Sequence, residues 1–148
     1  QFIIISNKSL KNKLIMQLGK KANTFMTSFK ILFRNTLKIL EDAPVIILVY
    51  NNRFLSKKTG QFGEPYASVT YLSEIEGISA AIQNMHLAAC SLGLGMAWLT
   101  IPLFAKSTFI KLIKTENELV AVLTVGYPSE EPKSFRRRPT SSIVTYEI

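Results

Sequence analysis

The sequence predicts a single α+β domain, because segments with helical spacing of apolar residues alternate along it with short apolar runs typical of strands. Its 148 residues are enough for one compact domain with a hydrophobic core. Hydrophobic residues make up 47% and charged residues 19%, a balance that excludes an intrinsically disordered chain. No internal repeat or linker-like stretch divides the sequence, so one domain over residues 1–148 is expected.

Strands are predicted where apolar or β-branched residues run together between turn residues. Phe2–Ile5 is the first such run and indicates a buried strand, and Val45–Tyr50 is the clearest run in the chain. Glu118–Val125 predicts a third strand, which ends at the turn-like segment Gly126–Pro128. Ser142–Ile148 alternates between polar and apolar side chains, which predicts a terminal strand.

Two helices are predicted between the first two strands. One runs from a capping Ser9 to about Gly19, with one apolar stripe formed by Leu10, Leu14 and Leu18. The other runs from Phe25 to Leu40, and Pro44 contributes to its end because the residue before a proline avoids helical backbone angles.

Residues 51–72 follow no regular period and contain the interrupting residues Gly60, Gly63 and Pro65. They predict a long loop with room for a short helix, and long ordered loops are usually lids or partner contacts. A further short helix is predicted at Ala105–Ile113.

The strongest helical pattern runs from Ser73 to Leu92. Its apolar face is formed by Ile78, Ala81, Ile82, Met85, Ala88, Ala89 and Leu92. Ser73 and Glu76 have the spacing of a capping box, so Glu74 and Glu76 are placed in the first turn. Four alanines allow close packing of neighbouring backbones, and we therefore expect this helix to be central and buried.

Gly93 and Gly95 are expected to cap that helix and turn the chain sharply into the apolar strand around Trp98. A dinucleotide-binding loop would need the order strand, glycines, helix. Here the order is helix, glycines, strand, and the third glycine position holds Trp98, so that kind of site is excluded.

The chain is basic, with a net charge of +8. Such a charge favours an anionic partner, which leaves nucleic acid, a membrane surface and a phosphorylated cofactor as alternatives. The single cysteine, Cys90, permits no intrachain disulfide and fits a reducing compartment. The apolar runs are far shorter than a membrane span, and no signal-peptide pattern is present. We expect a soluble, cytoplasmic protein that does not enter a membrane.

Four segments, in order, resemble the FMN-dependent nitroreductase family. They are Phe2–Lys8, Glu41–Val49, Ala81–Gly95 followed by Trp98, and Leu119–Pro128 followed by Arg136–Pro139. The resemblance implies a nitroreductase-like α+β fold with a central mixed, mainly antiparallel sheet flanked by helices. It also implies a homodimer with C-terminal strand exchange.

The same resemblance implies an enzyme that uses FMN as cofactor and NADH or NADPH as electron donor. Such an enzyme reduces nitroaromatic, quinone or related small-molecule acceptors by ping-pong hydride transfer through the flavin. In that family an N-terminal helical segment precedes the first strand and contacts the FMN phosphate. The sequence starts on the strand, so we expect a chain beginning at Gln1 to bind FMN weakly.

The resemblance also selects cofactor-binding residues. The segment after the glycines lies against the flavin in the family, which implicates Trp98, Leu99, Thr100 and Ile101. A basic residue of the tail reaches the FMN phosphate, where a guanidinium can bind two oxygens at once. Of the three consecutive arginines, Arg136 and Arg138 are favoured because they share one side of an extended segment.

No side chain is predicted to be catalytic, because the flavin would carry the chemistry. His86 lacks a neighbouring acid or nucleophile, and it and Cys90 are assigned to packing or an interface. These two residues lack further ligands, so no metal site is predicted. The arginines lack an aromatic platform, so no nucleic-acid site is predicted. Another flavin reaction, such as fragmentation or dehalogenation, and a non-catalytic flavin- or nucleotide-binding role stay open.

Overall fold

The structure, a computed structural model, describes residues 1–132, 134 and 136–147. One sheet contains four strands in the order β1-β2-β4-β3, and every neighbouring pair is antiparallel. The strands are β1 (Phe2–Ile5), β2 (Val45–Asn51), β3 (Gly95–Leu99) and β4 (Glu118–Gly126). The predicted α+β fold with a sheet flanked by helices is confirmed.

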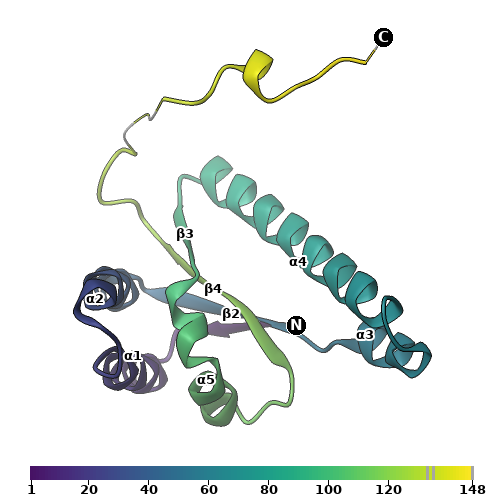
Figure 1. Ribbon diagram of the computed structural model, residues 1–148. Helices are drawn as coiled ribbons and strands as arrows, with labels where there is room; N and C mark the ends of the chain where they lie inside the picture. The colour runs from purple at the N-terminus through teal and green to yellow at the C-terminus, as the bar shows by residue number, and fades with distance from the viewer. Residues whose placement is uncertain (133, 135, 148) are drawn as a thin grey trace.

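The two faces of the sheet are covered by different helices (Figure 1). Helices α1 (Lys8–Ala22), α2 (Thr27–Asp42) and α5 (Lys106–Ile113) pack on one face and enclose the larger core. Helix α4 (Tyr66–Ser91) lies on the other face, over a smaller core around Ile47, Val49, Ile82, Ala121 and Leu123. The central strands β2 and β4 are therefore buried on both sides, which explains their almost continuous apolar sequence.

The first strand is not buried as predicted. β1 pairs only with β2 and forms an edge of the sheet, and Ile4 is 69% exposed. The opposite face of β1 contributes Ile5 to the larger core. An unbroken apolar run was therefore a poor guide to burial here, because it cannot distinguish an edge strand from a central one.

The predicted loop at 51–72 is largely helical. It contains α3 (Phe54–Thr59) and a 3-10 turn, η1 (Gly60–Phe62), and α4 begins at Tyr66. Ser73 lies inside α4, where its hydroxyl donates to the carbonyl of Val69, so the predicted capping box is wrong. Glu74 and Glu76 consequently lie within the helix and not in its first turn.

Helix α4 has 26 residues, a length of about 39 Å, and much of it is exposed in the single chain. Only Ile82 and Ala89 are buried, whereas Leu72 and Leu87 are 56% and 61% exposed. The prediction of a buried central helix is thus wrong for the isolated chain. One face of α4 packs on the sheet, and further apolar side chains lie outside that contact.

The prediction that Gly93 and Gly95 end the helix is confirmed for Gly93 alone. Gly93 has φ +70°, the left-handed value that favours glycine at a helix end. Gly95 has a different role, as the first residue of β3. A Cβ at Gly95 would lie 3.4 Å from Pro128, so a close backbone approach favours glycine there.

The two helices between β1 and β2 form where the sequence predicted them, but their first and last residues differ from the predicted ones. Asn7, and not Ser9, caps α1, because its side-chain oxygen accepts from the backbone N–H of Leu10. Helix α2 starts at Thr27 and extends to Asp42, immediately before Ala43 and Pro44. The predicted helix at Ala105–Ile113 is formed by α5 and by part of the preceding 3-10 turn η2 (Ile101–Ala105).

Pro128 still lies against Gly95 of β3, but the segment formed by residues 136–147 runs away from the sheet (Figure 1, yellow). It contains a 3-10 turn, η3 (Thr140–Ser142), and residues 143–147 form no strand. The predicted strand Ser142–Ile148 is therefore not formed over its described residues, and Ile148 lies outside them. A strand needs a neighbour for its backbone hydrogen bonds, and this segment lies away from the chain's own sheet. Among the described residues, no helix is both long and apolar enough to cross a membrane.

Tyr50 in β2 supplies a stability prediction. Its side chain is fully buried, and its hydroxyl has no hydrogen-bond partner among the described residues. Because an unpaired buried hydroxyl is unfavourable, we expect Tyr50→Phe to raise the free energy of unfolding by up to about 1 kcal/mol at pH 7. Urea unfolding followed by circular dichroism measures this change, and a loss of more than 1 kcal/mol would contradict the assignment.

The same residue predicts a dependence on alkaline pH. Burial raises the pKa of Tyr50 to about 12 in the folded protein, from 10.0 in the absence of folding. Below pH 10 the phenol is neutral in both states and its contribution is fully present. Between about pH 10 and 12 the unfolded state loses the proton first, so stability falls. Tyr50→Phe should show a smaller fall over this range than the wild type.

Candidate functional site

The last two residues of strand β3 lie on opposite faces of the sheet, because side chains alternate between the faces along a strand. Leu99 pairs with Val122 and is buried in the larger core. Trp98 pairs with Leu123, faces α4 and is 41% exposed. Of these two predicted site residues, only Trp98 therefore presents its side chain to a cavity; the side chain of Leu99 is part of the core.

The cavity beside Trp98 has a volume of about 360 Å³. It lies between the first half of α4, the end of β3, the turn η2 and the start of β4. Its apolar lining consists of Leu72, Ile75, Ile78, Ile82, Trp98, Leu103, Leu119 and Val120. A small volume with mainly apolar walls and a few polar groups is typical of a ligand site.

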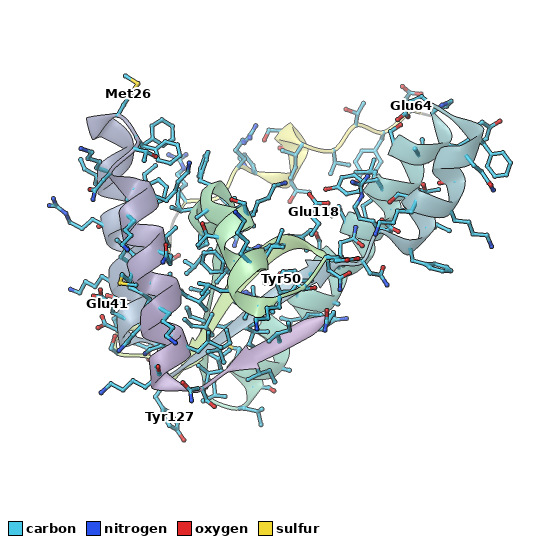
Figure 2. All side chains as sticks on the ribbon, turned by 90° about the horizontal axis from the view of Figure 1, so that it is seen from below. Met26, Glu41, Tyr50, Glu64, Glu118 and Tyr127 are labelled. Atoms are coloured by element: carbon cyan, nitrogen blue, oxygen red, sulfur yellow. The ribbon has the colours of Figure 1, made fainter. Side chains whose placement is uncertain are left out.

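Charged groups meet at the Glu118 side of this cavity. The ammonium group of Lys106 donates to Oε1 of Glu118 at 3.2 Å. The Nε atom of Arg53 lies 4.0 Å from Oε2 of Glu118. The guanidinium of Arg53 also lies over the ring of Tyr71, 5.1 Å from its centroid. Figure 2 shows the labelled Glu118 between α5 and the region of α3 and α4.

The Glu118 carboxylate is only partly satisfied by these neighbours. Its Oε2 atom is buried and accepts no hydrogen bond of ordinary geometry from the described residues, although the guanidinium of Arg53 and the hydroxyl of Tyr71 both interact with the carboxylate. The pKa of Tyr71 is raised, mainly by burial and then by the negative charge of Glu118 and a hydrogen bond to Glu118. The positive charges of Arg53 and Lys106 lower this pKa, but by less. The phenol of Tyr71 is therefore protonated at neutral pH.

Thr100 and Ile101 lie just beyond the sheet. The β3–β4 pairing ends at Leu99 and Val122, so the backbone N–H groups that follow are not part of this ladder. Thr100 is exposed, and Ile101 begins η2, whose Leu103 lines the cavity. The predicted strand exit therefore lies next to the Trp98 cavity.

Arg136 and Arg138 lie in the extended C-terminal segment and are exposed. The lining of the Trp98 cavity comes from residues between Tyr71 and Val120, so the single chain does not bring these arginines into it. The two halves of the predicted cofactor site are thus separate in this structure.

His86 and Cys90 border a second cavity, of about 510 Å³, near the end of α4. The Nε2 atom of His86 is buried without a hydrogen-bond partner among the described residues. Cys90 is exposed in the single chain, so of the two roles predicted for it packing in the core is wrong, and an interface role stays a prediction. Within the described part of the chain, no group of three or more His, Cys, Asp or Glu residues is arranged to hold a metal ion.

Glu74 connects α4 to α3 through its carboxylate. Its carboxylate accepts from the backbone N–H groups of Leu55 and Ser56, at 2.7 and 3.1 Å. It also accepts from the Ser56 hydroxyl and the Asn51 amide, both at 3.0 Å. Burial alone would raise the pKa of Glu74, but these hydrogen bonds together lower it.

We expect Glu74→Gln to loosen α3, because an amide has one acceptor oxygen in place of two and turns an NH₂ group toward donors. Amide hydrogen exchange at Leu55 and Ser56 should become about tenfold faster. Glu76→Gln, an exposed change on the same helix, is the control. Unchanged exchange at both amides in Glu74→Gln would contradict the anchoring role.

The charged cluster was not predicted from the sequence. Arg53 and Tyr71 fell in the segment interpreted as a loop, and Glu118 was assigned only to a strand. An available signal was the position of Glu118 as a charged residue at the start of an otherwise apolar strand. Its pairing with Lys106, twelve residues earlier, required the tertiary fold.

Comparison with known proteins identifies the family. The sequence profile described as "Nitroreductase family" matches residues 1–127. The chain belongs to the nitroreductase family. The matched region of this nitroreductase-family chain includes Trp98, Leu99, Thr100 and Ile101, whereas Arg136 and Arg138 follow it. No curated protein matches the sequence.

Solved structures share the nitroreductase fold. A BluB-like flavoprotein from Clostridium difficile 630 superposes with a TM-score of 0.77 at 25% identity, covering 99% of this chain and 78% of that one. A protein assigned as a nitroreductase from Desulfovibrio desulfuricans, in complex with FMN, gives 0.70 at 22%, covering 99% and 71%. The NADPH:FMN oxidoreductase from Vibrio harveyi, complexed with NAD⁺, gives 0.67 at 16%, covering 99% and 57%. The chain thus spans little more than half of some similar proteins.

Proposed function

We propose that this protein is an FMN-dependent oxidoreductase. It would take a hydride from NADH or NADPH and pass electrons to a nitroaromatic, quinone or related acceptor in a ping-pong reaction. Membership of the nitroreductase family supports the flavin-dependent class. The FMN complex of one structural neighbour and the NAD⁺ complex of another support the choice of cofactor and donor.

The observation that carries this proposal is the position of the Trp98 cavity beside the strand exit at Thr100 and Ile101. A flavin ring needs an apolar surface and nearby N–H donors for its polar edge; the apolar lining of the cavity and the N–H groups that follow the last β3–β4 pair support this choice. When bound, FMN would supply the group that accepts and donates the hydride. Trp98 would form one wall of the flavin site, and the backbone N–H groups after Leu99 would orient the flavin ring by hydrogen bonding.

Arg136 and Arg138 would bind the phosphate of FMN. Arginine suits this role because its planar guanidinium can donate two parallel hydrogen bonds to phosphate oxygens. The exposed position of both residues leaves their donors accessible in the single chain. Binding would require the C-terminal segment to lie over a site, on the same chain or on a second copy.

We also propose a cytoplasmic homodimer in which C-terminal strands are exchanged. Exposed apolar side chains along α4 support this assembly: Val69, Leu72, Leu87 and Leu92. The alternating residues 142–147 extend away from the chain's own sheet and could pair with a partner's edge strand (Figure 1). Sedimentation as a monomer at micromolar concentration would contradict the dimer.

Titration with FMN followed by absorbance and flavin fluorescence tests the cofactor assignment. NADH and NADPH oxidation, each with and without a quinone, then tests catalysis. FMN binding with acceptor-dependent oxidation supports the proposal. FMN binding without oxidation would favour a non-catalytic flavin-binding role. Because weak binding is expected, the titration extends to high FMN concentration, and absence of binding there would overturn the proposed cofactor.

A further inference from the structure

We propose that the hairpin formed by α1 and α2 docks the protein on the surface of an anionic lipid membrane. The contact would be made by the exposed side of α2 and by the tip of the hairpin, where the chain passes from α1 to α2. This inference does not rest on the proposed function. It departs from the expectation that the protein does not enter a membrane, because apolar side chains of the tip would reach the boundary between lipid headgroups and acyl chains.

The net charge of the chain is concentrated in this hairpin. Residues 1–40 contain eight of the 18 basic residues and none of the ten acidic residues, whereas residues 41–148 contain ten of each. All eight basic residues belong to α1 or α2, and all except Lys11 are exposed. Among the described residues, none of the eight forms an ion pair with a carboxylate. The hairpin therefore carries the whole net charge of +8 without local compensation.

Helix α2 arranges part of this charge as a stripe outside the core. Lys30, Arg34 and Lys38 are spaced four residues apart, so they follow one line along the helix, and all three are exposed. The same helix buries Phe33 and Leu40 in the larger core. The basic groups of the stripe are therefore free to contact lipid phosphates while α2 stays packed on the sheet.

The tip of the hairpin exposes large apolar side chains next to these charges. Met26, immediately before α2, is 78% exposed, and Ile31 in the second turn is 62% exposed. Phe29 and Leu32 are also exposed, and the ring of Phe29 packs against that of Phe104, with centroids 6.1 Å apart. Figure 2 shows Met26 at the end of α2, pointing away from the rest of the protein. Basic and apolar side chains side by side on a helix are typical of segments that lie in a membrane interface.

This combination favours a bilayer over other partners. A nucleic acid would bind the basic stripe but leave the aliphatic side chains Ile31 and Leu32 in water. A second copy of the hairpin would bring eight positive charges against eight. Helix α4, whose exposed side chains support the proposed dimer, lies on the opposite face of the sheet (Figure 1). The membrane contact and the dimer contact therefore do not compete for one surface.

Flotation of the full chain with lipid vesicles tests the proposal. Vesicles of phosphatidylcholine alone are compared with vesicles that also contain about 30% phosphatidylserine, at about 0.15 M salt. We expect partition into the anionic vesicles to be at least about tenfold stronger, because each exposed basic residue near an anionic surface strengthens binding. Equal partition into the two kinds of vesicle would overturn the proposal.

The double variant Met26→Gln, Ile31→Gln should lower partition into anionic vesicles about tenfold, because two apolar side chains no longer enter the interface. Phe54→Gln, Phe62→Gln removes two exposed apolar side chains from α3 and η1 and should leave partition unchanged. Equal effects of the two double variants would overturn the assignment of the tip. Circular dichroism checks folding; if the tip variant does not fold, the comparison of vesicles on the wild type decides alone.

A second pair of variants tests the basic stripe. Lys30→Gln, Arg34→Gln should lower partition into anionic vesicles about tenfold. Lys57→Gln, Lys58→Gln removes the same charge from exposed positions on α3 and should change partition less than about threefold, because distant exposed charges are screened. Equal effects of these two variants would indicate a non-specific charge effect and overturn the docking role of the hairpin.

Two further measurements separate a membrane from the other partners. Displacement of the wild type from anionic vesicles by a micromolar single-stranded RNA oligonucleotide would assign the hairpin to nucleic acid. Loss of a dimer on sedimentation of Met26→Gln, Ile31→Gln would assign the tip to a contact between copies. Either result would overturn the membrane contact, whereas failure of both to occur supports it. FMN and turnover enter none of these measurements, so this inference and the proposed function can fail independently.

Discussion

Replacing Gly126 with valine is expected to lower the free energy of unfolding by about 3 kcal/mol. Gly126 ends β4 opposite Gly95, next to the start of β2. A Cβ at this position would lie 2.7 Å from Cδ and 3.1 Å from Cγ of Pro44. The proline ring is fixed to its own backbone and cannot rotate away, so the strands themselves would have to separate. Chemical denaturation measures the loss.

Two further variants make this prediction specific. Gly77→Ala in α4 meets no atom within 4 Å and should raise stability by about 0.5–1 kcal/mol, because alanine is the better helix residue. Pro44→Ala removes the ring carbons that a side chain at 126 would meet. It should therefore recover part of the loss when combined with Gly126→Val. Equal stability of Gly126→Val and the wild type would show that the approach to Pro44 is not limiting.

The combined variant Arg136→Ala, Arg138→Ala is expected to weaken FMN binding about 100-fold, if these residues hold the phosphate as proposed. Each guanidinium would lose charge-assisted hydrogen bonds, and a loss of about tenfold per residue is a conservative value for such bonds. Replacement of both by lysine should also weaken binding, though less, because an ammonium group lacks the two-point geometry. Flavin fluorescence titration measures the dissociation constants.

A matched control separates this contact from the general effect of charge. Lys57→Ala, Lys58→Ala removes two positive charges from exposed positions on α3. It should change FMN affinity less than threefold at 0.15 M salt, where distant exposed charges are screened. An equal effect of the two double variants would indicate a non-specific charge effect and contradict the phosphate contact.

The elements that the sequence predicted well are those whose signal is local. The central strands β2 and β4 are buried on both sides, and their apolar residues run together for that reason. Gly93 ends α4 with a positive φ, which depends on the backbone of one residue. The start of α4 was missed because Pro65 and Gly63 appeared to be loop residues, although a proline can stand directly before a helix.

The candidate site divides in the same way. Trp98 was selected from a family motif, and it does line a cavity. Leu99 came from the same motif, but the alternation of the strand turns its side chain into the opposite core. Glu118 was missed because its neighbours Arg53 and Lys106 are 65 and 12 residues distant in sequence. No local pattern identifies such a cluster.

The sequence by itself determined the α+β class, the central strands, the glycine that ends α4 and the family, because each depends on residues close together along the chain. The tertiary structure alone decided that β1 is an edge strand, that α4 keeps exposed apolar side chains, and that a partly satisfied carboxylate borders the Trp98 cavity. These features depend on which elements become neighbours in space. That choice is made by the packing of two cores on opposite faces of one sheet.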